Sequence, residues 1–588
     1  MTRLFPRTAF RFPSPLVSVC VGAALAALSA ALPTSAQTTG NGFGLKDGDR
    51  VVFYGDSITD QRQYTVFVEN YVLTRFPTLK IDFTHSGWGG DRVTGGGGGP
   101  IDLRLRRDVF PYKPTVMTVM LGMNDGGYRA FDDGLFTTFS TGYKHILDSV
   151  RTEFPNVRLT LIQPSPYDDV TRAPGFPGGY NATLLRYADF LQATAPAYSA
   201  TVANLNAPVV AMLQQAKAMN APLAEKILPD RVHPSPAGHL VMAESLLRAW
   251  NAPAVVSRVS LDAARAKLLT SENTKVSGLK NGASLVWDQV DAALPIALDP
   301  ADPLVALVLK SSDFVTALDQ ETLMVRGLTP TTHYMITIDG AEIKDFTGEQ
   351  LAQGINLATL DTPMTQQANT VLALTRKHND QHFERWRTFQ TSLTARKNAA
   401  IDAALPPLLA ALDADEAKTV TAQRQAAQPV SHHYEIRPSV PLPTGPNLSL
   451  HKPYTASDPN TYNFGYGALT DGSWEANGLH TFATGDKDTF PKTATIDLQA
   501  ASRINTVIVG VPAFGSTKTI AIGVSADGTT FIPVGSFVFS QRREQKHRFT
   551  FAAVNARYVR LTYPDHYEAT VDYTPTFAFT TEAEVYAP

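Results

Sequence analysis

The spacing of apolar and polar positions divides this 588-residue chain into parts with different predicted architectures. From about residue 45 to 252, short β-branched runs alternate with segments whose apolar residues recur at helical spacing. This alternation is typical of a parallel sheet covered by helices on both faces, so we expect a three-layer α/β domain with a flavodoxin-like sheet over 45–252. The predicted strands are Val51–Tyr54, Leu79–Ser86, Thr115–Leu121, Val157–Gln163 and a short Val209-Val210, and the predicted helices are Thr65–Phe76, Phe136–Glu153, Ala182–Thr194 and Pro236–Trp250.

The remaining sequence predicts a small mixed β region over 255–363, a helical segment over 365–428, a linker over 436–446 and an all-β sandwich over 447–588. In the mixed region, Leu323–Gly327, Tyr334–Asp339 and Ala341–Phe346 predict a β meander with a turn at Asp339-Gly340. The alanine-rich segment predicts two helices broken near Pro406-Pro407.

The N-terminus has the pattern of a secretory signal peptide over residues 1–36. Three arginines in the first eleven residues precede the apolar stretch Leu16–Leu32, and small residues lead to a predicted cut after Ala36. A permanent anchor is the alternative, but the stretch is short for a membrane span and no charged stop follows it. The only cysteine, Cys20, lies too early in the stretch for lipid attachment. We therefore expect an exported protein, periplasmic or extracellular, that has neither disulfides nor stable membrane insertion.

The charge of the chain bears only on which partners are not expected. The formal net charge is −3, with mixed signs along the chain and no long basic run. This gives no electrostatic reason to expect nucleic acid as a partner.

Four short motifs in the first predicted domain supply groups that can act together. Ser57 follows the first predicted strand in Gly55-Asp56-Ser57, and a serine nucleophile needs a base and a carboxylate that orients the base. His233 would take the Ser57 proton, and Asp230, three residues earlier, would orient the imidazole. The Ser57 and Gly90 N–H groups and the Asn124 side-chain amide would stabilise an oxyanion. A glycine at 90 keeps the approach to the substrate open.

Each group also has a simpler explanation. Asn124 is typical of a turn and Asp230 of a helix cap. Asp56 and Asp91 are better explained as residues that hydrogen-bond their own loops than as a second acid. The four motifs together favour the catalytic interpretation.

The motifs Gly55-Asp56-Ser57, Gly90-Asp91, Gly122–Asp125 and Asp230–His233 resemble the four blocks of the SGNH (GDSL-type) hydrolase superfamily. The resemblance covers about residues 45–252 and implies Ser57 as nucleophile, Asp230 and His233 as its triad partners, and Gly90 and Asn124 in the oxyanion hole. It implies no cofactor for catalysis.

Two further features leave alternatives open. The run Gly95–Gly99 is either a flexible surface loop or a mobile wall of the substrate cleft, and it lacks the Gly-Lys-Ser/Thr of a phosphate loop. His378 and His382, four residues apart on a predicted helix, could hold a metal, but the apolar stripe they share favours packing between domains. The stretch Gly348–Arg387 resembles a region that follows the hydrolase domain in some exported bacterial SGNH proteins, which favours docking onto that domain.

The last segment resembles discoidin (coagulation factor 5/8 C) and related carbohydrate-binding modules. The resemblance rests on Ala494–Leu498, Val524–Gly528 and Ala556–Leu561. It implies a jelly-roll-like sandwich that grips glycans and a structural calcium ion near Asp471 and Glu582. Three side chains could either stack on a sugar or pack the sandwich, namely Trp474, His480 and Phe482.

Together these observations predict an exported serine esterase that removes acyl groups, most simply acetyl, from carbohydrates. A lipase, phospholipase or thioesterase could use the same triad. The alternative from another class is a glycan-binding protein with a vestigial hydrolase domain, which the complete set of site residues disfavours.

Overall fold

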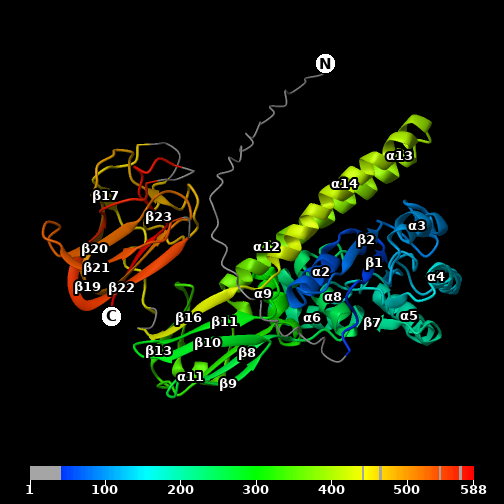
Figure 1. Cartoon of the computed structure of the whole chain (residues 1–588), viewed down its shortest axis with the longest axis horizontal. Coiled ribbons are helices and arrows are strands. Elements are labelled where there is room, and N and C mark those ends of the chain that lie inside the picture. The colour runs from blue at the N-terminus through cyan, green and yellow to red at the C-terminus, as the bar shows by residue number, and fades with distance from the viewer. Residues whose placement is uncertain (1–41, 440–442, 462–465, 542–543, 569–572) are drawn as a thin grey trace, which may run out of the picture.

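The computed structural model describes residues 42–439, 443–461, 466–541, 544–568 and 573–588. The predicted signal peptide and Cys20 lie outside the described residues. Figure 1 shows an α/β part, a mixed β part, a long helical hairpin and a separate C-terminal β sandwich.

A five-stranded parallel sheet forms the centre of the α/β part. Its strand order is β2-β1-β5-β6-β7, and every neighbouring pair is parallel. The strands are β1 (Arg50–Gly55), β2 (Asp82–Gly87), β5 (Val116–Met120), β6 (Arg158–Ile162) and β7 (Thr201–Ala203).

The predicted strand at Val209-Val210 is wrong. These residues lie in α6 (Asn206–Met219), where Val209, Met212, Leu213 and Ala216 are buried at helical spacing. The last strand is β7 instead, which is short and precedes α6.

Helices cover both faces of the sheet because alternate strand residues point to opposite sides. Val51 and Phe53 of β1 belong to one buried apolar cluster, and Val52 and Tyr54 belong to another. Apolar residues of α2 (Gln63–Arg75), α6 and α8 (Pro236–Ala249) join the first cluster, and those of α4 (Asp133–Glu153) and α5 (Gly179–Thr194) mostly join the second.

The mixed β part contains two sheets rather than one meander. β12 (Gln320–Arg326) pairs in parallel with β8 (Val255–Asp262), in a sheet of order β15-β12-β8-β9. The predicted hairpin is present as β13 (His333–Ile338) and β14 (Ala341–Thr347), but it belongs to the second sheet, β10-β11-β16-β13-β14. Because β12 pairs with β8, which lies far from it in sequence, β12 belongs to a different sheet from β13 and β14, the strands that follow it in the chain. The other strands are β9 (Lys267–Glu272), β10 (Thr274–Asn281), β11 (Leu285–Asp291) and β15 (Ile355–Asn356), and the short helices are α9 (Pro303–Lys310), α10 (Phe314–Leu318) and α11 (Gly348–Gln353).

The helical hairpin turns earlier than the prolines predict. α12 (Pro363–Phe383) continues through a π-helical turn, η4 (Glu384–Thr391), and the short α13 (Ser392–Thr394). Lys397 has a φ of 49°, and the Asn398 side chain caps α14 (Ala399–Ala426), so the reversal falls at these residues. Pro406 and Pro407 lie inside α14 and do not break it, although proline in a helix interior removes a backbone donor and crowds the carbonyl of residue i−4.

After the hairpin the chain returns to the second sheet. β16 (Ser431–Pro438) pairs with both β11 and β13, so residues 436–438, predicted as the start of the linker, belong to a strand. The alternating pattern of His432, Tyr434 and Ile436, all buried, explains why this stretch is a strand.

The C-terminal sandwich has its own apolar core. Its main sheet has the order β17-β19-β22-β20-β21, with β24 also on β19, and its buried residues form a cluster separate from the rest of the protein. The strands are β17 (Tyr454–Ala456), β18 (Phe482–Ala483), β19 (Lys492–Val511), β20 (Thr519–Ser525), β21 (Ile532–Val538), β22 (Gln545–Tyr563), β23 (Phe579–Thr580) and β24 (Ala583–Tyr586). Arg548 of β22 pairs with Asp345 of β14 at 3.2 Å, which links the sandwich to the mixed β part.

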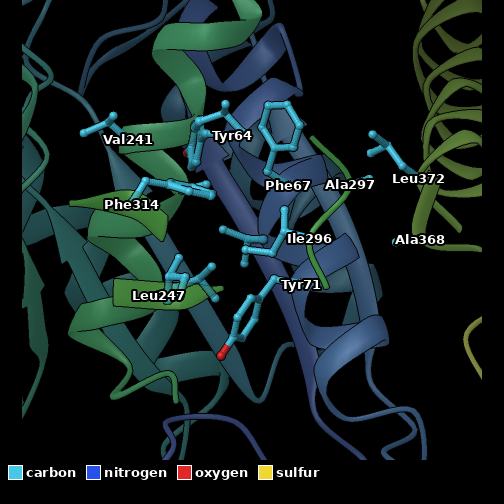
Figure 2. Packing of buried hydrophobic residues seen from close by; sticks show 14 of the residues in the cluster. Tyr64, Phe67, Tyr71, Val241, Leu247, Ile296, Ala297, Phe314, Ala368 and Leu372 are labelled. Atoms are coloured by element: carbon cyan, nitrogen blue, oxygen red, sulfur yellow. The ribbon is translucent and has the colours of Figure 1, made fainter. Parts of the chain in front are cut away.

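One continuous core joins the α/β part to the mixed β part and to the hairpin. Figure 2 shows Tyr71 of α2 below Ile296, with Phe314 of the mixed part on one side and Leu372 of α12 on the other, and all four belong to one buried cluster. These three parts therefore pack as one unit. Within the described ranges, no helix is long and apolar enough to cross a membrane.

Candidate active site

Ser57 lies at the carboxyl end of β1, where the strand turns directly into a helix. It is the first residue of α1 (Ser57–Asp60). The Asp56 side chain caps α1 by accepting the Ile58 N–H at 3.1 Å, which explains this acid as a turn residue. Burial raises the pKa of Asp56 to about 7. Gly55 is required at the end of β1, because a Cβ there would lie 2.7 Å from the carbonyl oxygen of Met120.

His233 and Asp230 come from the loop before α8 and meet Ser57. The Ser57 Oγ lies 2.7 Å from His233 Nε2, and His233 Nδ1 lies 2.6 Å from Asp230 Oδ2. The other Asp230 oxygen accepts the backbone N–H groups of Val232 and His233 at 3.0 and 2.7 Å. Burial would raise the pKa of Asp230, but these hydrogen bonds outweigh it and hold the pKa below its ordinary value. Asp230 is thus a charged acceptor that fixes the imidazole ring.

Gly90 lies in the loop that follows β2, which we call the Gly90 loop (residues 88–91). Its φ of 76° is in the left-handed region that favours glycine, and a Cβ there would meet nothing within 4 Å. The N–H groups of Trp88, Gly89 and Asp91 donate to Gly55 O, Asp60 Oδ2 and Trp88 O. The described residues provide no acceptor for the Gly90 N–H, so this donor remains available beside open space.

Asn124 lies in the turn after β5, and its amide is held at both ends. Its Nδ2 donates to the carbonyl oxygen of Asp91 at 3.0 Å, and its Oδ1 accepts the Tyr128 hydroxyl at 2.9 Å. The first bond ties the Asn124 turn to the Gly90 loop.

Two neighbouring acids hold the loops, as expected for Asp91. Asp91 Oδ2 accepts from Arg104 Nε at 2.8 Å, and both side chains are buried. Asp125 Oδ1 accepts the Val93 N–H at 2.9 Å, and burial raises the pKa of Asp125 to about 6.

The glycine run forms a small hairpin of β3 (Gly95–Gly96) and β4 (Gly99–Pro100). A Cβ on Gly98 would lie 2.6 Å from the Arg104 side chain and 2.7 Å from the Trp88 ring. Close packing against Arg104 and Trp88 thus explains why at least part of the run is glycine.

His378 and His382 lie where the hairpin docks on the α/β part. His378 donates from Nδ1 to Glu69 Oε1 of α2, at 2.9 Å, and from Nε2 to Glu416 Oε1 of α14, at 3.0 Å. His382 is buried and packs beside Trp386, with ring centroids 6.1 Å apart. These contacts agree with the packing interpretation. Across the described residues, no group of three or more His, Cys, Asp or Glu side chains is arranged to hold a metal ion.

In the sandwich, Phe482 is buried against Tyr454 and is unavailable to a sugar. Trp474 is partly buried, with Lys546 Nζ 4.1 Å from its ring centroid, and His480 Nδ1 lies 2.7 Å from Asp471 Oδ2.

Sequence reasoning missed three residues that contact the site loops, namely Asp60, Tyr128 and Arg387. Asp60 lies three residues after Ser57 of the nucleophile motif, so its position was a usable signal. Arg387 ends the Gly348–Arg387 stretch that was expected to dock on the hydrolase domain, but that resemblance gave it no role in the site. Tyr128 carries no comparable local pattern.

Comparison with known proteins identifies two parts of the chain. Residues 53–241 match the GDSL-like Lipase/Acylhydrolase family, and residues 468–561 match the NedA-like, galactose-binding domain. An acetylxylan esterase of Geobacillus stearothermophilus is 24% identical over 222 residues, which make up 34% of this chain and 93% of that protein.

Two of the solved structures that this chain matches are the following. One described as a gut microbial diltiazem-metabolizing enzyme is 26% identical, with a TM-score of 0.60, and the match covers 67% of this chain and 98% of that one. A chitosan-binding module of a chitosanase/glucanase from Paenibacillus sp. IK-5 is 25% identical, with a TM-score of 0.20, and covers 24% of this chain and 100% of that one.

Proposed function

We propose that this protein is an exported serine esterase that removes acetyl groups from carbohydrates. Residues 53–241 match the GDSL-like Lipase/Acylhydrolase family, and an acetylxylan esterase is among the relatives of this chain. The observation that carries the proposal is the hydrogen-bonded series Ser57–His233–Asp230.

The geometry supports acyl transfer through Ser57. The Ser57 oxygen attacks the ester carbonyl carbon while its proton passes to His233 Nε2, and Asp230 stabilises the resulting imidazolium. The tetrahedral intermediate collapses, the bond to the sugar oxygen breaks, and His233 returns the proton to that oxygen. Water then attacks the acyl-enzyme by the same route and releases the acid and free Ser57. Neither step requires a cofactor.

In this proposal, three donors stabilise the tetrahedral oxyanion. These are the backbone N–H groups of Ser57 and Gly90 and the Nδ2 of Asn124. Loss of one such donor typically costs about 10²–10³ in kcat.

Two comparisons support a carbohydrate ester as substrate. The relative in Geobacillus stearothermophilus is an acetylxylan esterase, and the sandwich matches a galactose-binding domain family. A module that binds sugar would hold a polymer near Ser57 and raise its local concentration. Export is supported by the sequence pattern of residues 1–36.

We further propose that Asp471 and Glu582 hold a structural calcium ion in the sandwich. Glu582 is buried, its Oε1 has no hydrogen-bond partner among the described residues, and its Oε2 accepts the Gly472 N–H at 3.2 Å. Burial, together with the nearby Asp471 carboxylate, raises the pKa of Glu582 to about 9. Oxygen donors of this kind fit Ca²⁺, and the ion would neutralise two neighbouring carboxylates.

Acetate release from a panel of acetylated polysaccharides tests the function. The wild-type protein is expected to release acetate, and Ser57→Ala is expected to release none above the rate without enzyme. A profile of p-nitrophenyl esters from two to sixteen carbons, run in parallel, should fall with chain length. Activity that rises with chain length would favour a lipase, and equal activity of wild type and Ser57→Ala would favour a glycan-binding protein without catalysis.

A further inference from the structure

The π-helical turn η4 lies outside the residues that match the hydrolase family, yet it contacts the Gly90 loop at Trp88 and the end of α1 at Asp60. π-Helical turns are frequent at functional sites. Two consecutive residues of η4, Trp386 and Arg387, make these contacts.

Arg387 binds the end of the helix that begins with Ser57. Its Nη2 donates to both carboxylate oxygens of Asp60, each at 2.8 Å. Its guanidinium carbon also lies 3.4 Å from the centroid of the Trp88 ring, so the cation stacks on the first residue of the Gly90 loop. Arg387 therefore joins α1 to this loop.

Asp60, which Arg387 holds, in turn fixes the backbone next to Gly90. Its Oδ2 accepts the Gly89 N–H at 3.0 Å. With the N–H groups on either side of Gly90 bonded, the Gly90 N–H is the donor that remains for an oxyanion. A shift of the loop would move this donor away from the place where charge develops.

Trp386 is connected to the second donor, Asn124 Nδ2, through a series of buried charged side chains. Its Nε1 donates to Asp108 Oδ1 at 2.6 Å, and Asp108 also accepts from Arg104. Arg104 Nε donates to Asp91, whose carbonyl oxygen accepts Asn124 Nδ2. Both oxyanion donors are thus connected to one turn of the hairpin.

We propose that Arg387 is a positioning residue that sets the oxyanion hole through Asp60 and Trp88, so that the hairpin completes the active site of the α/β domain. This inference rests on the proposed serine esterase function. Arg387 touches neither substrate nor Ser57 in this assignment, and it acts through the Gly90 loop.

Steady-state hydrolysis of p-nitrophenyl acetate by the full-length protein tests this inference. Arg387→Ala is expected to lower kcat about tenfold to thirtyfold, less than the loss of a whole oxyanion donor, and to change KM less than about threefold. The pH profile of kcat/KM should keep its shape because Ser57, His233 and Asp230 are untouched.

Arg385→Ala is the matched control. Arg385 belongs to the same turn, but its Nε pairs with Asp413 of α14 at 2.6 Å and not with the Gly90 loop. Its kcat should stay within about twofold of wild type. Thermal melts of both variants, read by circular dichroism, identify any loss that is only unfolding.

A double-mutant cycle with Asp60→Ala makes the test specific. Because Arg387 acts in part through Asp60, the loss of kcat in the double variant should be smaller than the product of the two single losses. Three results would overturn the inference. Arg387→Ala could keep the wild-type kcat, Arg385→Ala could lose as much kcat as Arg387→Ala, or the two single losses could multiply in the double variant. Ser57→Ala, assayed alongside, separates the two proposals: if it stays active, the esterase mechanism itself fails.

Discussion

At the level of single residues, the donors of the site are oriented by neighbours that do no chemistry. The Asn124 amide shows this directly, because Tyr128 binds its oxygen and Asp91 O accepts from its nitrogen. These two bonds leave little freedom for the amide to rotate, so an oxyanion would meet a donor already in place.

Removal of the Tyr128 hydroxyl should therefore slow catalysis without removing a catalytic group. In Tyr128→Phe we expect kcat to fall about threefold to tenfold, since a hydrogen bond of this kind contributes about 1 kcal/mol and tenfold in rate is about 1.4 kcal/mol. Steady-state kinetics with p-nitrophenyl acetate measures this fall in kcat.

Tyr167→Phe is the control for this substitution. The Tyr167 ring packs near Tyr128, with centroids 6.3 Å apart, but its hydroxyl makes no bond to Asn124. If both substitutions lower kcat equally, the loss of kcat does not come from the hydrogen bond between the Tyr128 hydroxyl and Asn124.

The residues that meet at the site could largely be predicted, because each nucleophile, base and donor stands in a short motif at the end of a predicted strand or before a predicted helix. Their supporting contacts could not. Arg387 and Asp60 are 327 positions apart, and nothing in the local sequence of either names the other.

At the level of elements, the hairpin is fixed to α2 by a buried polar cluster centred on Glu69. The Glu69 carboxylate bonds His378 of α12, Asn379 of α12, His85 of β2 and Gln423 of α14. Burial would raise the pKa of Glu69, but the two histidines outweigh it and hold the pKa well below its ordinary value. Burial would lower the pKa of His378, but Glu69 and Glu416 outweigh it and raise the pKa to about 10.

These shifts predict how the docking of the hairpin depends on pH. A raised histidine pKa stabilises the fold fully below the unfolded value of about 6.5, and the effect is lost as pH rises toward about 10. The lowered Glu69 pKa stabilises above the unfolded value near 4.5 and is lost in acid. The melting temperature of wild type should exceed that of His378→Gln most between about pH 5 and 6.5, and the difference should shrink toward pH 10.

His145→Gln provides the comparison. His145 pairs with Asp102 at 2.7 Å, but both side chains are about half exposed, so the pair should contribute little at any pH. A His378→Gln difference that stays constant with pH, or grows toward pH 10, would contradict the assignment of a charged histidine.

The elements that sequence periodicity predicted well are those whose pairing is local or whose apolar stripe is strong. The helices α2, α4, α5 and α8 and the β13–β14 hairpin are of this kind. The assignment of β12 to the other sheet and of β16 to the gap between β11 and β13 depends on contacts across the whole mixed region. Contrary to the sequence prediction, Pro406 and Pro407 do not break the helix but lie inside α14, and the reversal falls at Asn398.

At the level of the whole molecule, the described residues form two structural units with separate cores. One apolar cluster runs from the α/β sheet through the mixed β part to α12, and another is confined to residues 469–585. The buried Arg548–Asp345 ion pair crosses between the units. Since cooperative unfolding follows shared cores, we expect the sandwich to unfold in its own calorimetric transition.

This separation makes the calcium proposal testable on the intact protein. Without a cation, the raised Glu582 pKa means that the sandwich is stabilised below the unfolded value near 4.5 and loses stability as pH rises toward about 9. Calcium at a hundred times its dissociation constant adds about 2.7 kcal/mol, or about 5–10 °C for a unit of this size. Scanning calorimetry at pH 8 should show that calcium raises only the transition of the sandwich.

Glu582→Gln distinguishes a bound ion from a general salt effect. The amide has nearly the shape of the acid but cannot be ionised, so this variant should lose the calcium response and also lose the fall in stability between pH 7 and 9. Magnesium chloride at the same ionic strength controls for screening, because Mg²⁺ demands a tighter octahedral shell than a site of this kind offers. If calcium raises both transitions alike, or if Glu582→Gln responds as wild type does, the ion is not held by Glu582.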